Sequence, residues 1–176
     1  MATRPTSDRL RETLFNVLAP RIEGAAFLDL YAGSGAVGIE ALSRGAGRVE
    51  FVERAPAALV VLRGNLAKLG VAAGFRIHEG SVGTVLRRMK PSADVASGAA
   101  FDVVFMDPPY DAAKEYEITL EILGGSLGGL LAPEAVVIAE HRKKERLEDR
   151  YGALGRTRLL EQGDASLSFY AVSQGE

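Results

Sequence analysis

The segment Phe27-Leu28-Asp29-Leu30-Tyr31-Ala32-Gly33-Ser34-Gly35-Ala36-Val37-Gly38 passes from an apolar run through a glycine-rich turn into residues that favour a helix. Its glycines let the backbone approach a ligand where a Cβ atom would clash, and the start of a helix offers unpaired N–H groups. This order predicts the first βα unit of a parallel sheet, with a ligand at the carboxyl end of the strand. The G-x-G-x-x-G spacing alone would equally suit a pyrophosphate.

Around this unit, apolar runs alternate with amphipathic stretches, which predicts an α/β fold built on a parallel sheet. Strands are expected at residues 26–31, 48–53, 75–78, 101–107 and 135–141. Helices are expected at residues 8–18, 36–44, 56–69, 82–89 and 114–123, with Pro20 stopping the first one. A Gly163-Asp164 turn between residues 157–161 and 167–171 predicts a terminal antiparallel hairpin, as in a methyltransferase-type sheet rather than an all-parallel dinucleotide-binding sheet.

The composition indicates one domain that covers residues 1–176, because 47% hydrophobic and 25% charged residues suit a single α/β core. No apolar stretch approaches the roughly 20 residues that cross a bilayer, and charged residues crowd the N-terminus, so a cytoplasmic protein is expected. The chain has no cysteine, and its two histidines, His78 and His141, are isolated in the sequence. No metal site is therefore expected.

The formal net charge of −2 argues against nucleic-acid binding by the whole surface and leaves only local basic patches. One patch lies near the N-terminus and contains Arg4, Arg9, Arg11 and Arg21. The other, at residues 142–146, contains four cations offset by nearby acids and is expected to be a solvated helix with surface salt bridges.

Two acids bear on the identity of the ligand at the glycine turn. Glu53 ends the second expected strand, where a carboxylate can accept hydrogen bonds from the ribose hydroxyls of either NAD or S-adenosylmethionine. Asp29 lies inside the first strand, where its charge would attract an ammonium or sulfonium group and repel a pyrophosphate. Asp29 could alternatively cap a helix or form a salt bridge, and Glu53 could be a solvated strand-end acid.

Asp107, Pro108, Pro109 and Tyr110 follow the apolar run 101–106. Two prolines stiffen the chain, and the strand end faces the crevice where ligands bind. The Asp107 carboxylate and the Pro108 carbonyl offer two acceptors beside a ring that can stack on a base. This arrangement matches the methylation of an exocyclic amino group, and the alternative is a rigid turn with a solvated acid.

These segments, in this order, resemble the RsmD family, bacterial methyltransferases that modify N2 of a guanine in small-subunit (16S) ribosomal RNA with S-adenosylmethionine. The resemblance rests on the entry motif Arg4-Pro5-Thr6-Ser7-Asp8-Arg9-Leu10-Arg11-Glu12-Thr13-Leu14-Phe15-Asn16, on 29–46, on Phe51-Val52-Glu53, on 107–110 and on Glu140-His141. It implies a class I, Rossmann-like methyltransferase sheet, in which residues 1–22 form an entry helix segment over the substrate mouth.

The residues and the resemblance together define the expected site. The catalytic residues are Asp107, Pro108, Pro109 and Tyr110. The cofactor contacts are Thr6, Asp29, Tyr31, Ala32, Gly33, Ser34, Gly35, Glu53, Arg54, Gly80, Ser81 and Asp107; Arg54 is included for its place beside the ribose acid, without a specific role. The substrate contacts are Arg4, Arg9, Arg11 and Tyr110. The expected partner is 16S ribosomal RNA or a 30S assembly intermediate, bound by a monomer.

The chain departs from the family in two places. A short basic hairpin usually precedes the Arg-Pro-Thr segment, and this chain begins almost at that segment, which suggests a truncated or late-annotated start. Gly80-Ser81 stands where the family often has an acid near the adenine. Three other functions are considered. The first is an N6-adenine DNA methyltransferase, but this chain lacks room for a target-recognition domain. The second is an NAD-dependent oxidoreductase, but this chain offers no proton-transfer His or Lys at a strand end. The third is a noncatalytic RNA-binding module.

Overall fold

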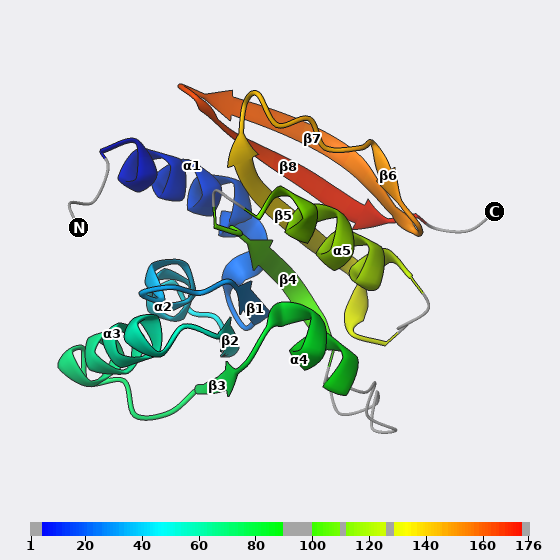
Figure 1. Cartoon of the computed structure of the whole chain (residues 1–176). Helices are drawn as coiled ribbons and strands as arrows, with labels where there is room; N and C mark the ends of the chain where they lie inside the picture. The colour runs from blue at the N-terminus through cyan, green and yellow to red at the C-terminus, as the bar shows by residue number, and fades with distance from the viewer. Residues whose placement is uncertain (1–4, 90–99, 110–111, 126–128, 174–176) are drawn as a thin grey trace.

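One mixed sheet forms the centre of the computed structural model, which describes residues 5–89, 100–109, 112–125 and 129–173. Within these residues eight strands follow the order β3-β2-β1-β4-β5-β8-β7-β6 (Figure 1). The strands are β1 (Ala26–Leu30), β2 (Arg48–Glu53), β3 (Phe75–Glu79), β4 (Phe101–Met106), β5 (Leu131–Arg142), β6 (Arg150–Tyr151), β7 (Leu154–Gln162) and β8 (Ala165–Val172). The helices are α1 (Pro5–Ile22), α2 (Ala36–Ser43), α3 (Pro56–Lys68), α4 (Val82–Arg88) and α5 (Ala113–Gly124).

Strands β1 to β5 run parallel, and the chain reverses the direction in which it adds strands beside β1. It builds β2 and β3 on one side of β1 and then returns to place β4 and β5 on the other. Strand β8 pairs antiparallel with β5, and β7 pairs antiparallel with β8. The predicted fold, a parallel sheet finished by an antiparallel hairpin, is confirmed. In such sheets ligands bind where the strand order reverses.

Helices cover both faces of the parallel strands, as Figure 1 shows. Phe27 of β1 and Phe51 of β2 join one core with α1, α2 and α3. Leu28 of β1 and Val104 of β4 join a second core with α4 and α5. Burial on both faces explains why the central strands are almost continuously apolar. Every residue of β1 is buried, and Asp29 is its one charged residue.

Helix α1 differs from the prediction, because it does not stop at Pro20 but continues to Ile22 with the proline inside it. A proline this close to the C-terminal end removes one backbone hydrogen bond, and its ring is exposed to solvent. Leu18 and Ile22 are buried in the core on either side of Pro20. Their burial favours the extra turn, and local sequence signals could not reveal it.

The charged segment 142–149 is not the helix that the sequence suggested. Arg142 is the last residue of β5, and the residues after it form turns and extended chain. The backbone N–H of Lys143 donates to the Asp164 carbonyl at 2.8 Å, and its side chain pairs with Glu161 at 3.3 Å. Contacts with the β7–β8 hairpin therefore hold this segment, instead of pairs along a helix. The hairpin strands are also longer than expected, with β7 beginning at Leu154.

Candidate functional site

The carboxyl ends of β1, β2, β4 and β5 meet at one edge of the sheet, and each carries an acid at or near its end. These acids are Asp29 in β1, Glu53 at the end of β2, Asp107 after β4 and Glu140 near the end of β5. Three of them were expected from the sequence, which separated them by as many as 78 residues of chain. Parallel pairing of β1 with both β2 and β4 brings them together.

In the turn between β1 and α2, each glycine is required for a different structural reason. Gly33 and Gly35 have φ values of 58° and 82°, which side-chain-bearing residues rarely adopt. A Cβ atom at Gly35 would lie 2.2 Å from a Leu62 methyl group, and one at Gly38 would lie 2.3 Å from the Phe51 ring. Those two glycines allow α2 to pack closely on the sheet and on α3. No atom lies within 4 Å of a Cβ at Gly33, so this glycine borders open space.

Glu53 holds the glycine turn in place from the neighbouring strand. Its Oε1 accepts a hydrogen bond from the Gly33 N–H at 2.8 Å, and its Oε2 accepts from the N–H groups of Arg54 and Ala55 at 2.9 Å. A carboxylate has about four acceptor positions, so Glu53 keeps capacity for ligand hydroxyl groups. Arg54 is exposed beside it. The site therefore presents a fixed acid next to open backbone, which fits the ribose of an adenosyl group.

Asp29 lies beneath the turn, where only 2% of its surface is exposed. Its Oδ2 accepts a hydrogen bond from the Gly38 N–H in the first turn of α2 at 3.0 Å. Burial raises the pKa of Asp29 to about 8, although the Gly38 hydrogen bond lowers it. Asp29 thus acts as a buried capping acid for α2, one of the two alternatives left open by the sequence. A nearby cationic ligand would lower this pKa again, so capping does not exclude a role toward a cofactor.

Tyr31 connects the glycine turn to α5. Its φ is 58°, and among the described residues it is the one non-glycine residue with a positive φ. Its hydroxyl group donates to Glu115 at 2.7 Å and lies 2.7 Å from the Thr119 hydroxyl. An unfavourable backbone conformation persists only where surrounding contacts enforce it, and these two hydrogen bonds supply such contacts. The sequence placed Tyr31 at the cofactor but gave no signal of its link to α5.

Other expected cofactor residues belong to the same edge of the sheet. The Ala32 N–H donates to the Val52 carbonyl at 3.0 Å, and the Gly80 N–H donates to the Glu53 carbonyl at 3.0 Å. Ser34 is exposed, and its carbonyl accepts from Asn65 at 2.9 Å. The Ser81 hydroxyl caps α4 by accepting from the Thr84 N–H. Gly80 and Ser81 thus lie directly after β3, but the Ser81 side chain is already engaged in capping.

Asp107, Pro108 and Pro109 follow β4 directly. Pro108 is buried, whereas Pro109 is exposed and its carbonyl accepts from the Ala112 N–H at 3.0 Å. Asp107 reaches the surface, yet protein groups surround its carboxyl group. The loss of water raises the pKa of Asp107 well above its ordinary value, and the neighbouring Glu140 raises it further.

Glu140 is the site residue that sequence reasoning missed. Met106 of β4 pairs with Ala139 of β5, so the next residue of each strand, Asp107 and Glu140, brings its carboxyl group to the same point. The two carboxyl groups therefore influence each other's protonation, and the Glu140 carboxyl group raises the pKa of Asp107. Burial also raises the pKa of Glu140. An acid at the end of the strand that follows Asp107 was a usable signal, but the pairing of β4 with β5 was needed to interpret it.

The N-terminal substrate residues are only partly described. Arg9 is exposed on α1, and Arg11 is half-buried and pairs with Asp8 at 3.3 Å, one turn away. Thr6 lies within α1, but its side chain is outside the described part. Arg4 and Tyr110 also lie outside the described residues. The roles expected for them remain predictions.

In the described ranges, no cluster of three or more acids or histidines could hold a metal ion. No described helix is both long enough and apolar enough to span a membrane.

The chain is similar in sequence to proteins named as ribosomal RNA methyltransferases. YlbH of Bacillus subtilis, which carries the provisional name of an rRNA methyltransferase, is 31% identical over 169 residues, covering 96% of this chain and 88% of YlbH. Ribosomal RNA small subunit methyltransferase D of Escherichia coli strain K12 is 38% identical over 137 residues. That match covers 78% of this chain and 63% of the relative, so the chain matches less than two thirds of that protein.

Solved structures support the same relationship. The yhhF protein of Escherichia coli, provisionally named a methyltransferase, superposes with a TM-score of 0.81 and 31% identity, over 99% of this chain and 92% of its own. A model of the family described as "Conserved hypothetical protein 95" matches residues 1–171. Because that match spans nearly the whole sequence and agrees with the relatives above, the chain belongs to this family, the RsmD methyltransferases.

Proposed function

We propose that this protein transfers a methyl group from S-adenosylmethionine to the exocyclic N2 amino group of a guanine in small-subunit ribosomal RNA. The observation that carries the proposal is the position of Asp107 and its two prolines at the end of β4, next to the strand that leads into the glycine turn. An acceptor pair for an amino group thus lies beside an adenosyl-type cradle. The names of the curated relatives support the choice of ribosomal RNA as substrate.

The residues at the sheet edge fit the cofactor. Glu53 would hold the ribose hydroxyls, the open backbone at Gly33 would admit the adenosyl group, and Asp29 would contribute negative charge near the ammonium end. Arg54, Gly80 and Ser81 would border the same group. When bound, S-adenosylmethionine supplies a methyl group on a positively charged sulfur, which is already a strong electrophile.

The protein's task is then to position a weak nucleophile. Asp107 and the Pro108 carbonyl would accept the two hydrogens of the amino group, which frees the nitrogen lone pair for attack. Tyr110 would stack on the base, and such stacking contributes roughly 1–3 kcal/mol. The two prolines keep the acceptors in place, because each fixes its φ near −65°.

The amino nitrogen must lose one proton as it gains a carbon substituent. Asp107 would be the acceptor at this position, and Glu140 would act beside it, since the two carboxyl groups influence each other's pKa. The raised pKa of Asp107 makes the carboxylate a better base than an ordinary aspartate. We assign Glu140 to this proton-accepting pair, with Asp107 in contact with the substrate.

The substrate would be 16S ribosomal RNA, either free or in a 30S assembly intermediate, and the enzyme would act as a monomer in the cytoplasm, where that RNA is assembled. Arg4, Arg9 and Arg11 of the entry segment would contact phosphates at the substrate mouth. Arg11 would have to exchange its partner Asp8 for a phosphate.

A methyl-transfer assay with tritiated S-adenosylmethionine tests the proposal. Its substrates are undermethylated 30S subunits, free ribosomal RNA and DNA. We expect incorporation into small-subunit RNA, recovered as N2-methylguanosine after digestion. Asp107→Asn should lower kcat by at least about 100-fold, because an amide offers a weaker and differently polarised acceptor, while S-adenosylhomocysteine affinity changes little.

Asp164→Asn is the matched control, since Asp164 is an exposed acid in the β7–β8 turn. Full turnover by the Asp107 variant would contradict the assignment of the acceptor. Methylation of adenine in DNA, with none in ribosomal RNA, would instead support the rival N6-adenine DNA methyltransferase.

A further inference from the structure

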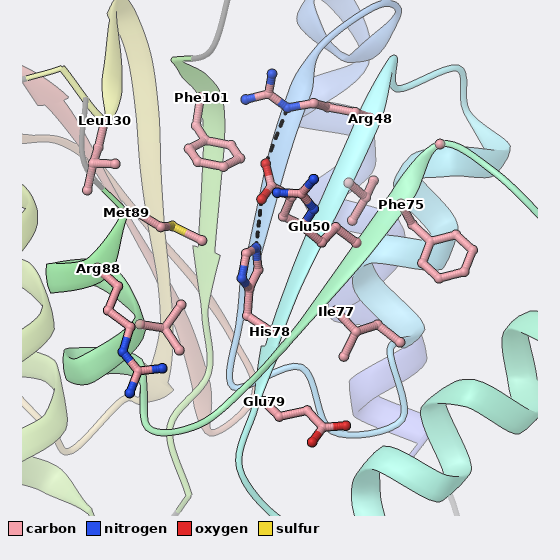
Figure 2. Close-up of a pocket in the computed structure, with 14 residues that line it drawn as sticks. Arg48, Glu50, Phe75, Ile77, His78, Glu79, Arg88, Met89, Phe101 and Leu130 are labelled. Carbon is pink, nitrogen blue, oxygen red and sulfur yellow. Dashed lines mark hydrogen bonds and ion pairs between the residues drawn. The ribbon is translucent and has the colours of Figure 1, made fainter. Parts of the chain in front are cut away.

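A hollow of about 880 Å³ opens over β2 and β3, on the side of the sheet that α4 covers (Figure 2). It extends along the first half of β2 and the whole length of β3. None of the residues that line it is among the expected cofactor or catalytic residues. The hollow therefore adjoins the proposed methyl-transfer site at Glu79, the register partner of Glu53, and extends away from that site along β2 and β3.

The sheet face at the hollow is polar, and the described helices cover it only in part. Helix α4 has only seven residues, which corresponds to a length of about 10 Å. Of the β2 residues that face this side, Val52 joins the core beneath α4 and α5, whereas Arg48 and Glu50 line the hollow. On β3 the corresponding residues are Arg76 and His78. The faces of a parallel sheet are usually buried and apolar, so polar side chains on this face indicate contact with water or with a polar partner.

The floor of the hollow is ordered by its own contacts. Glu50 bridges two cationic or basic groups: its Oε2 lies 3.4 Å from the Arg48 Nε, and its Oε1 lies 2.7 Å from the His78 Nε2. The Arg48 guanidinium group also lies over the Phe101 ring, with 4.9 Å between its carbon and the ring centroid. Figure 2 shows these side chains side by side between β2 and β4. The Phe101 ring and Glu50 thus hold the Arg48 guanidinium group in position in the floor of the hollow.

The rim carries a surplus of positive charge. Arg76 of β3 and Arg88 of α4 are both exposed, and neither forms an ion pair with a residue in the described part of the chain. Two acids line the hollow: Glu50 is paired with Arg48 and His78, and Glu79 is paired with Arg63 of α3. Two guanidinium groups are therefore available to an anionic partner.

We propose that this hollow, called the groove from here on, binds the phosphodiester backbone of the RNA substrate at a point away from the reacting base. Guanidinium groups form paired hydrogen bonds with phosphate oxygens, so the exposed Arg76 and Arg88 suit this partner. The strand β2 runs from Arg48 in the groove to Glu53 at the cofactor site, a distance of about 17 Å for an extended chain, so one folded RNA can contact both. The inference rests on the proposed RNA substrate, and it assigns that substrate a second contact.

The double variant Arg76→Gln/Arg88→Gln tests this inference by fluorescence anisotropy with a labelled fragment of small-subunit ribosomal RNA. We expect RNA affinity to fall about tenfold, because two charge-assisted contacts are lost. The slope of log affinity against log salt should become shallower by about 1.5, as expected for two phosphates. The KM for RNA should rise, whereas kcat at saturating RNA and the affinity for S-adenosylhomocysteine should not change.

The matched control is Arg87→Gln/Lys68→Gln, which removes the same charge from exposed positions that do not line the groove. The control should keep the wild-type affinity and salt slope. An equal loss in both double variants would mean that general charge, not the groove, binds RNA, and would overturn the inference. Unchanged RNA affinity in the Arg76/Arg88 variant would overturn it as well, as would a mononucleotide that binds the groove without competing with RNA.

This test is separate from that of the proposed function. Anisotropy measures RNA binding without methyl transfer, so an enzyme that fails to methylate ribosomal RNA but shows the expected loss of affinity would count against the reaction alone.

Discussion

At Asp29, burial in the folded protein opposes ionisation of the carboxyl group, while its hydrogen bond favours ionisation. It lies in the most buried strand of the sheet, and the N-terminus of α2 offers it a single backbone donor. The hydrogen bond and the positive end of the helix dipole favour the carboxylate, but the loss of water favours the neutral acid more strongly. The balance raises the pKa of Asp29 to about 8.

This raised pKa should make stability decrease as pH rises. The folded-state pKa lies above the unfolded value of 3.8, so the folded protein binds more protons between these values and loses stability through this interval. Between pH 5 and 8 the loss from Asp29 is roughly 3 to 4 kcal/mol. Asn at this position keeps an acceptor for Gly38 without ionising. Urea unfolding at several pH values should show a flatter profile for Asp29→Asn than for the wild type, and parallel profiles would contradict the burial argument.

At the scale of elements, the contact of α2 with β2 depends on glycine. A Cβ at Gly38 would lie 2.3 Å from the Phe51 ring and 2.9 Å from a Val49 methyl group, both fully buried. Neither neighbour can move freely in a packed core, so α2 itself would have to shift. A shift of α2 would also displace the glycine turn that leads into it.

Gly38→Ala should therefore destabilise the protein by about 1–3 kcal/mol, the usual cost of overpacking, and weaken S-adenosylhomocysteine binding. Gly64→Ala is the matched control, because Gly64 lies within α3 with nothing within 4 Å of its added Cβ. That variant should gain about 0.5–1 kcal/mol from the better helix propensity of alanine. Urea unfolding and calorimetry measure both variants. Equal effects would show that the close approach of α2 to β2 is not what requires glycine.

The neighbouring ends of β4 and β5 create the Asp107–Glu140 pair. Asp107 must be ionised to accept a proton, so activity should rise with pH through its raised pKa. Burial is the largest cause of the raised pKa of Asp107, and the neighbouring Glu140 is the next. Glu140→Gln removes this second cause and should therefore move the acidic limb of the kcat profile to lower pH. Glu117→Gln, on an exposed face of α5, should leave the profile unchanged. An unshifted profile for the Glu140 variant would remove Glu140 from the proton-accepting pair.

For the whole molecule, the reversal of strand order beside β1 decides where a ligand can bind. It places the glycine turn, Glu53 and the Asp107 turn around one crevice, with acids and no described cation at the glycine turn except the exposed Arg54. A cationic adenosyl ligand would favour the ionised form of these acids, whereas a pyrophosphate would find only the exposed Arg54 as a described cation at the glycine turn. This arrangement favours S-adenosylmethionine over NAD, which the glycine spacing alone could not do.

Thermal unfolding tests this preference in the intact protein. S-adenosylhomocysteine at about 100 times its Kd should stabilise the folded state by about 2.7 kcal/mol, which corresponds to a Tm increase of roughly 5–10 °C. NAD at the same concentration should give no shift, because among the described residues at the glycine turn only the exposed Arg54 could pair with its pyrophosphate. A comparable shift with NAD would contradict the electrostatic argument.

The amino-acid sequence by itself determined the alternation of strands and helices, the glycine turn and the Asp-Pro-Pro turn. These features depend on residues close together in the chain, whose periodicity and backbone preferences are local. Tertiary structure alone decided that Glu140 lies beside Asp107 and raises its pKa, and that Tyr31 bonds to Thr119, 88 residues away. It also decided the pKa of Asp29 and the exposure of the groove below α4. Each of these depends on which distant groups come together and exclude water, and strand pairing across the sheet settles that.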